Sequence, residues 1–150
     1  MPNHITNTVE IHVWHSDDKE TVDKVLKLLR NEDSEGEVID FGCIIPQPDN
    51  LFTGNLGSKE REQCAIEGRP NWYDWQIDAW GTKWNAYSQS LLDQDDGTLR
   101  IQFDTAWAAP LPVIEALRDL IEEKFPEDEG YETWVVGSWL EEGYQSAGVF

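Results

Sequence analysis

The amino-acid sequence predicts an α+β fold in which an antiparallel sheet carries two helices on one face. Apolar and polar residues alternate along residues 4–14, as they do along a strand with one buried face. Apolar residues recur every three or four positions over residues 17–30 and again over 111–125, as in helices that bury one side. Further runs rich in β-branched and aromatic residues lie between and after these helices and indicate the remaining strands.

The first part of the chain predicts a strand, a helix and a second strand. The face of the first strand that we expect to be buried carries Ile5, Asn7, Val9, Ile11 and Val13. Ser16 or Asp17 is expected to cap a helix that runs to Arg30. The apolar run VIDFGCII, residues 38–45, predicts the second strand, and the two prolines that follow would end it.

A long connection follows over residues 46–70, with a short helix expected at about 58–67. From residue 71 the aromatic residues take up helical spacing, and Gly81 is a suitable end for that helix. The aromatic residues of this segment are Trp72, Tyr73, Trp75, Trp80, Trp84 and Tyr87.

The second part of the chain begins with a predicted hairpin, formed by residues 84–92 and 98–107 around the turn sequence DQDDG. Two prolines open the helix at 111–125, where the missing N–H group costs little. Strands are expected over 131–140 and, in a shorter form, over 143–150.

These elements predict one domain over residues 1–150. If residues 46–92 are treated as an insertion, the order is strand, helix, strand, strand, helix, strand. This is the split β-α-β arrangement called ferredoxin-like. In it, the strands at 4–14 and 98–107 would be adjacent and central, and both helices would cover the same face.

The composition excludes several classes of function. Thirty acidic and eleven basic residues give a net charge of −19, which repels nucleic acid and anionic lipid surfaces. No stretch approaches the roughly 20 apolar residues of a membrane span, and the first residues do not resemble a signal peptide. The two cysteines, Cys43 and Cys64, are more typical of a reducing compartment than of a disulfide framework. We therefore expect a cytoplasmic protein.

Several segments together are similar to one known family. They are MPNHITNTVEI, DFGCIIPQP, WYDWQIDAWGTKWNAY, FDTAWAAPLPVIEAL followed by FP, and EEGYQSAGVF. In this order they resemble the YubB ferredoxin-like family, small proteins carried mainly by plasmids, phages and prophages. The resemblance implies the ferredoxin-like fold and a mobile genetic element as the source. It supplies no catalytic residues.

The tryptophans allow two interpretations, a packed scaffold or a ligand platform. We favour the scaffold, because tryptophan is rarely left exposed and each buried ring removes roughly 150–250 Å² from water. On this interpretation Trp80, Trp84 and Trp107 are mostly buried, and the tryptophan-rich segment forms a second small core along the sheet.

A polar pocket on the open face of the sheet is the alternative site. Glu10, His12, Arg100 and Asp104 would share that face and could supply acid–base chemistry, although a solvated, salt-bridged surface is the simpler interpretation. No metal spacing is evident, and the acidic turn at residues 93–97 departs from a calcium loop in its glycine position and closing residue. The sequence predicts no cofactor, no metal site and no catalytic residue.

Acidic clusters point to a different kind of site. Acids at the end of the second core helix oppose the helix dipole, so stability alone does not account for them. Carboxylates spaced along a rigid scaffold can instead mimic nucleic acid phosphates and occupy a basic groove. The residues expected to bind a partner in this way are Asp95, Asp96, Glu122, Glu123, Asp128 and Glu129.

The leading hypothesis is therefore a non-enzymatic protein of a mobile element. It would inhibit a host nucleic-acid-binding defence protein, such as a CRISPR–Cas effector, by covering its basic surface, without binding nucleic acid or membrane itself. A small-ligand binder or enzyme that uses the sheet-face pocket remains an alternative. So does an accessory interaction domain whose acidity only confers solubility.

Overall fold

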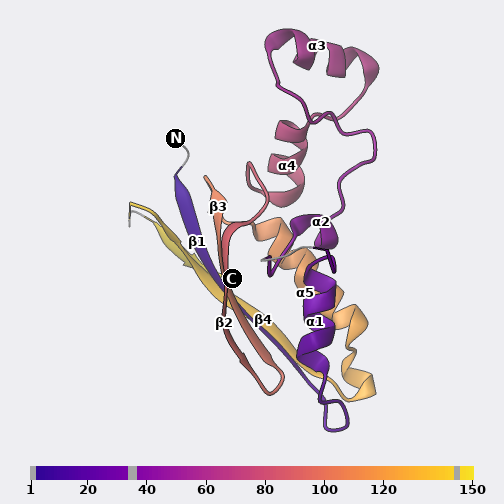
Figure 1. Ribbon diagram of the computed structural model, residues 1–150, viewed down its shortest axis with the longest axis vertical. Coiled ribbons are helices and arrows are strands. Elements are labelled where there is room, and N and C mark those ends of the chain that lie inside the picture. Colours follow the sequence, from indigo (N-terminus) through magenta and orange to yellow (C-terminus); the bar gives the residue numbers. More distant parts are fainter. Residues whose placement is uncertain (1–2, 34–36, 144–145) are drawn as a thin grey trace.

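The computed structural model describes residues 3–33, 37–143 and 146–150, which form an α+β structure around a five-stranded antiparallel sheet (Figure 1). The strands lie in the order β2-β3-β1-β4-β5. Their bounds are β1 His4–Trp14, β2 Tyr87–Asp95, β3 Thr98–Ala106, β4 Glu132–Glu141 and β5 Ala147–Val149. The predicted adjacency of the strands at 4–14 and 98–107 is confirmed, because β1 pairs with β3 on one side and with β4 on the other.

The two long predicted helices cover the same face of this sheet (Figure 1). They are α1 and α5, and further helices lie between them in the chain. The bounds are α1 Thr21–Leu29, α2 Phe41–Ile44, α3 Ser58–Glu67, α4 Trp72–Trp80 and α5 Leu111–Lys124, followed by the 3-10 turn η1 Glu127–Glu129.

The core lies between these two helices and the sheet. Alternate residues of β1 are buried, as the sequence pattern predicts, and pack with the apolar sides of α1 and α5. The buried apolar residues of the helices are Val22, Val25 and Leu29 in α1 and Val113, Ile114, Leu117 and Ile121 in α5. Full burial of one such side chain contributes about 1.5–3 kcal/mol, so this layer holds the helices to the sheet.

Trp80 belongs to this main core and not to the separate second core that the sequence suggested. It is 1% exposed and packs edge-to-face on Phe41, with ring centres 5.7 Å apart. Its indole N–H donates to the carbonyl oxygen of Ile45 at 3.0 Å. The end of α4 is thereby fixed to the core.

Helix α1 begins later than predicted. Neither Ser16 nor Asp17 caps it, because residues 15–18 form a turn closed by a bridge between His15 and Asp18. The Asp18 carboxylate accepts from the Glu20 N–H group at 2.9 Å. A side chain that bonds the backbone two residues on favours a turn, and the helix starts only after it.

The predicted strand at 38–45 is wrong, since α2 forms there instead. In a strand, the backbone N–H groups of this segment would donate to a neighbouring strand. Here they donate to the side-chain oxygens of two residues of a distant segment. Gln89 Oε1 accepts from Val38 N at 2.7 Å and from Ile39 N at 2.8 Å, and Asn85 Oδ1 accepts from Phe41 N at 3.0 Å. The place beside β3 is taken by β2, which the sequence had assigned to the insertion at about 46–92.

The helices α3 and α4 form an arm beyond one end of the sheet (Figure 1). Asn71 caps α4 by accepting from Asp74 N at 2.9 Å, and Gly81 ends it in the left-handed conformation, φ 78°. The predicted bounds of both helices are confirmed within one or two residues.

We predict that Gln89→Ala lowers the free energy of unfolding by about 1–3 kcal/mol, because it leaves the half-buried N–H groups of the 38–39 segment without an acceptor. Urea unfolding followed by tryptophan fluorescence measures this loss. Gln94→Ala, on the exposed part of the same strand, is the matched control and should change little. Equal effects of the two substitutions would contradict the structural role of Gln89.

Candidate functional site

One end of the sheet brings together three chain segments that carry acidic residues. The turn between β2 and β3 lies against the end of β1, where Val13 N donates to Gly97 O at 2.8 Å. On the other side of β1, Trp14 pairs with Glu132 at the start of β4, directly after η1. The hairpin turn and the end of α5 therefore meet at one end of the molecule, shown at the bottom of Figure 1.

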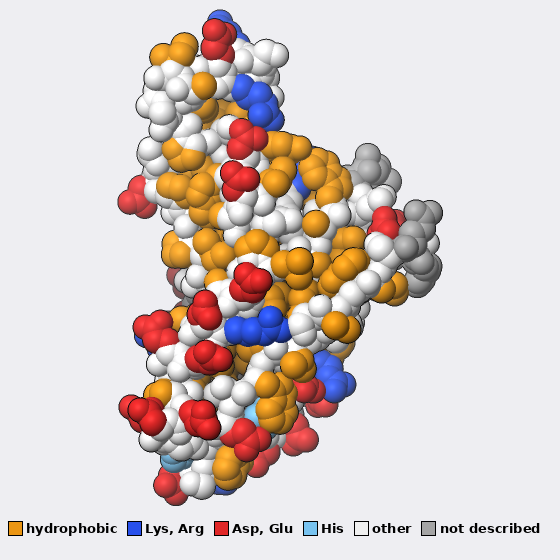
Figure 2. All heavy atoms as spheres, turned by 180° about the vertical axis from the view of Figure 1, so that it is seen from behind, with side chains coloured by type: hydrophobic (Ala, Val, Ile, Leu, Met, Phe, Trp, Pro, Cys, Tyr) orange, Lys and Arg blue, Asp and Glu red, His pale blue; other side chains and the backbone are white. Residues whose placement is uncertain are grey.

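We call this region the acidic end. Its carboxylates are all exposed and belong to Asp17, Asp93, Asp95, Asp96, Glu122, Glu123, Glu127, Asp128, Glu129 and Glu132. All six residues predicted to bind a partner are among them. The cations near it include Lys24, Lys124 and Arg100, which lies opposite Asp93 in the β2–β3 ladder, but the ten carboxylates outnumber them and the region stays strongly negative. Figure 2 shows acidic side chains gathered over the lower part of one face, with few basic ones among them.

An open groove runs through the acidic end between the last turn of α5 and the start of β4. Its lining combines acidic and apolar residues, namely Glu122, Phe125, Pro126, Glu127, Asp128, Tyr131, Glu132 and Thr133. Phe125 is buried beneath it and packs on Tyr131, with ring centres 5.3 Å apart. Such a lining suits a lysine or arginine, whose stem is apolar and whose head is charged.

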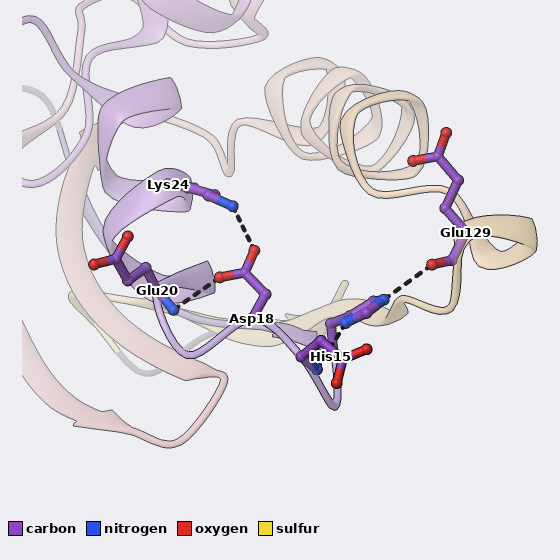
Figure 3. Close-up of polar contacts among 6 residues, drawn as sticks. His15, Asp18, Glu20, Lys24 and Glu129 are labelled. Atoms are coloured by element: carbon purple, nitrogen blue, oxygen red, sulfur yellow. Dashed lines mark hydrogen bonds and ion pairs between the residues drawn. The ribbon is translucent and has the colours of Figure 1, made fainter.

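The wall of the groove is held in place by His15 (Figure 3). His15 Nε2 donates to the carbonyl oxygen of Glu129 at 3.0 Å, and His15 Nδ1 accepts from Asp17 N at 3.0 Å. The two bonds together require the neutral ring with its proton on Nε2. The ring also lies 4.7 Å from that of Tyr131, so η1 is anchored on two sides.

The neighbouring turn is fixed by Asp18, which accepts from Glu20 N and pairs with Lys24 (Figure 3). The contact with Lys24, followed by the bond from Glu20, lowers the pKa of the Asp18 carboxyl below its ordinary value. Asp18 is thus occupied by internal contacts, whereas the surrounding acids of the acidic end point to solvent.

The alternative pocket on the open sheet face is only partly assembled. Glu10 accepts from Arg100 at 3.2 Å and from the indole N–H of Trp134 at 3.0 Å. His12 stacks on Trp134 with ring centres 3.8 Å apart. Asp104 lies four residues beyond Arg100 along β3, a separation of about 13 Å, and its carboxylate accepts from the Thr6 hydroxyl instead.

The polar side chains of this pocket bond mainly to one another, as residues that stabilise a fold do. The hydrogen bonds from Trp134 and Arg100 lower the pKa of Glu10, which keeps it ionised at neutral pH. Within the described residues, no group of histidine, cysteine, aspartate and glutamate side chains is arranged to hold a metal ion. Burial, with nearby carboxylates, raises the pKa of the Cys43 thiol, which disfavours the reactive thiolate.

The prediction for two of the three tryptophans is wrong. Trp84 and Trp107 are 39% and 45% exposed, and only Trp80 is buried. Trp107 directly follows β3 and adopts φ 75°, a left-handed conformation that few bulky residues take. The ammonium of Lys83 lies against both exposed rings. In the sequence, only the position of Lys83 directly before Trp84 hints at a contact between the two. Nothing in the local pattern predicts that Trp107, which is distant in the chain, contacts the same lysine.

Comparison with protein-family models, with curated proteins and with solved structures gives no match for this chain. The resemblance to the YubB family therefore stays a prediction. In the part of the chain that the structure describes, every helix falls short of the length and apolar character that crossing a membrane requires.

We predict that the contribution of Glu10 to stability depends on pH. Since the folded state lowers its pKa below the usual 4.5, the ionised carboxylate stabilises the protein above that value, and the gain is lost as the pH falls through the folded-state pKa. Glu10→Gln should lower Tm by about 2–4 °C at pH 7 and by progressively less below pH 4.5.

Calorimetry of both proteins between pH 7 and pH 3 measures this difference. Trp134→Phe keeps a ring on His12 and removes the N–H donor, so Glu10→Gln should cost less in that background. A difference in Tm that stays constant with pH would show that the bonds to Glu10 do not stabilise its ionised form.

Proposed function

We propose that this protein is an acidic, non-enzymatic binding protein of a phage or another mobile genetic element. It acts in the cytoplasm of the bacterial host by covering the basic surface of a nucleic-acid-binding protein, such as a CRISPR–Cas effector. The observation that carries this proposal is the acidic end, where all six predicted residues meet from two distant parts of the chain. The mobile-element origin rests on the resemblance to the YubB family.

The proposed architecture is ferredoxin-like. It is supported by the order β2-β3-β1-β4, by the antiparallel pairing of these strands and by the two helices on one face. In this arrangement β2 takes the place of the second core strand, and the connection before it carries α2, α3 and α4.

The proposed mode of binding is electrostatic mimicry. Duplex DNA presents one charge per about 1.7 Å of its axis, and a protein that binds it offers a matching row of lysines and arginines. Clustered carboxylates on a fixed scaffold attract the same row and accelerate encounter with it. His15 serves this role by anchoring η1, which carries three of the acids.

The placement of these acids favours a binding role over a structural one. Glu122 and Glu123 lie in the last turn of α5, where negative charge opposes the helix dipole at a cost of about 0.3–1 kcal/mol each. Neither forms an ion pair among the described residues. Glu10, in contrast, is engaged by two internal bonds, so the sheet-face pocket gives the enzyme alternative less support.

We predict that reversing four charges at the acidic end weakens partner binding by roughly tenfold or more, which corresponds to about 1.4 kcal/mol. The variant combines Glu122→Lys, Glu123→Lys, Asp128→Lys and Glu129→Lys. Its stability should be unchanged or slightly higher, because the end of α5 gains cations. The control reverses Asp49, Glu62, Glu67 and Asp78, which are exposed acids outside the acidic end, and changes the net charge by the same amount.

The measurement begins with capture of a partner from host lysate on the tagged protein, with both variants as parallel baits. Fluorescence polarisation then reports whether the protein releases labelled nucleic acid from that partner. Release should weaken steeply between 50 and 300 mM salt, since charges on an interface are screened over about 8–10 Å at moderate ionic strength. A partner that keeps its nucleic acid in the complex, or that binds equally well in high salt, would rule out mimicry.

A further inference from the structure

A chain of exposed or half-buried aromatic rings lies at the end of the sheet opposite the acidic end. We call it the aromatic strip, and it comprises Tyr73, Trp107, Trp84, Tyr87 and His4 with Lys83 in its middle. Tyr73 contacts Trp107 edge-to-face at 6.1 Å between ring centres, and Trp84 contacts Tyr87 at 6.3 Å. The strip therefore joins α4, the loop after it, and the strands β1, β2 and β3.

At the centre of the strip the ammonium of Lys83 lies over the rings of two tryptophans, and we call the place that it occupies between Trp84 and Trp107 the slot. Lys83 Nζ lies 4.6 Å from the ring centre of Trp84 and 4.7 Å from that of Trp107. Both distances are within the range of a cation–π interaction. Among the described residues Lys83 forms no ion pair with a carboxylate, so the two ring faces are what hold its charge.

The loop that carries Lys83 is rigidly placed. Gly81 adopts a left-handed conformation, φ 78°, and a Cβ there would lie 2.7 Å from Pro112 Cδ, so only glycine fits. Thr82 is buried, and its hydroxyl donates to the carbonyl oxygen of Trp84 at 2.6 Å. These contacts fix the start of the loop and the tryptophan that follows Lys83.

Trp107 is held outward at a conformational cost. Its φ of 75° lies in the left-handed region, which is unfavourable for a residue with a bulky side chain. The strained turn is secured by Trp107 N, which donates to Asn3 O at 2.9 Å, and by Thr105, whose hydroxyl donates to Ala108 O at 2.7 Å. The side-chain amide of the buried Asn7 donates to the Thr105 hydroxyl oxygen at 3.0 Å and holds it in this position. The exposed ring of Trp107 gains little stabilisation from burial that would offset this backbone strain. An unfavourable conformation that keeps a large ring at the surface therefore points to a binding role.

We propose that the slot between Trp84 and Trp107 binds a cationic side chain, a lysine or arginine of a partner protein, in exchange for Lys83. The faces of the indole rings attract cations, and the charge of −19 favours a basic partner over phosphate groups or nucleotides. Lys83 keeps the slot closed until such a side chain replaces it. The identity of the partner rests on the proposed function, whereas the slot itself can be tested with a small cation.

The test titrates choline, as a probe for the ammonium group, into Lys83→Ala and into the wild-type protein. The readout is the indole N–H resonances of Trp84 and Trp107, assigned with single Trp→Phe variants. We expect saturable shifts in both proteins, with roughly fivefold tighter binding to Lys83→Ala because the internal competitor is gone. The resonance of Trp80 should stay in place and reports that the core is intact.

Two controls make the outcome decisive. The uncharged alcohol 3,3-dimethyl-1-butanol has the shape of choline, and equal shifts with it would overturn the proposal in favour of a general apolar patch. Equal choline affinity in wild type and Lys83→Ala, or no shift in either, would also overturn it. Trp107→Leu should abolish the choline response while leaving the Trp80 resonance unchanged.

The captured partner separates this proposal from the proposed function. Trp107→Leu should weaken partner binding severalfold with little change in its salt dependence, whereas reversal at the acidic end should flatten that dependence. Loss of the choline response together with undiminished partner binding would refute the exchange with a partner side chain and leave mimicry standing. A slot that binds choline in a protein that fails the nucleic acid competition would refute mimicry alone.

Discussion

The structure depends on the two-faced central strand β1. It is hydrogen-bonded to β3 along one edge and to β4 along the other, and its alternate side chains are buried beneath α1 and α5. A shift of one residue in its register would expose Val9, Ile11 and Val13 and bury Glu10, which the burial of apolar surface forbids. The register of β1 in turn fixes which residues meet at each end of the sheet.

That register places two chemically different surfaces at opposite ends of the same strands. The acidic end follows from the turn between β2 and β3 and from the entry into β4, while the aromatic strip surrounds the start of β1 and the end of β3. The nine residues of β3 separate them by about 30 Å. A partner that contacts both the acidic end and the aromatic strip must present basic side chains over that distance. A groove that binds nucleic acid has basic side chains spaced in this way.

As proposed, the two surfaces would attract cations through different physical interactions. The carboxylates of the acidic end act at a distance, are screened by salt and chiefly set the rate of encounter. A cation–π contact in the tryptophan slot would act only at short range and favour a cation that has lost its water, so it would prolong the lifetime of the proposed complex. If both proposals hold, the protein would attract basic surfaces broadly and retain those that place a lysine or arginine in the slot.

The sequence alone determined the elements whose pattern is local. Alternation predicted β1 and β3, periodicity predicted α4 and α5, and the acids of the acidic end were visible as clusters. Their convergence was not visible, because Asp95 and Asp128 are brought to one end only by the pairing of β1 with β3 and β4.

Tertiary structure decided the rest. An apolar run such as 38–45 fits a strand or a buried turn equally well. Here β2 occupies the edge of the sheet beside β3, so the run is not needed as a strand. Gln89 and Asn85 accept hydrogen bonds from its N–H groups instead. The exposure of Trp107 likewise came from a left-handed turn secured by Asn3 and Thr105, contacts made across the fold. Side chains far apart in the chain settle such questions, because a local pattern specifies which residues prefer burial but not which neighbours will cover them.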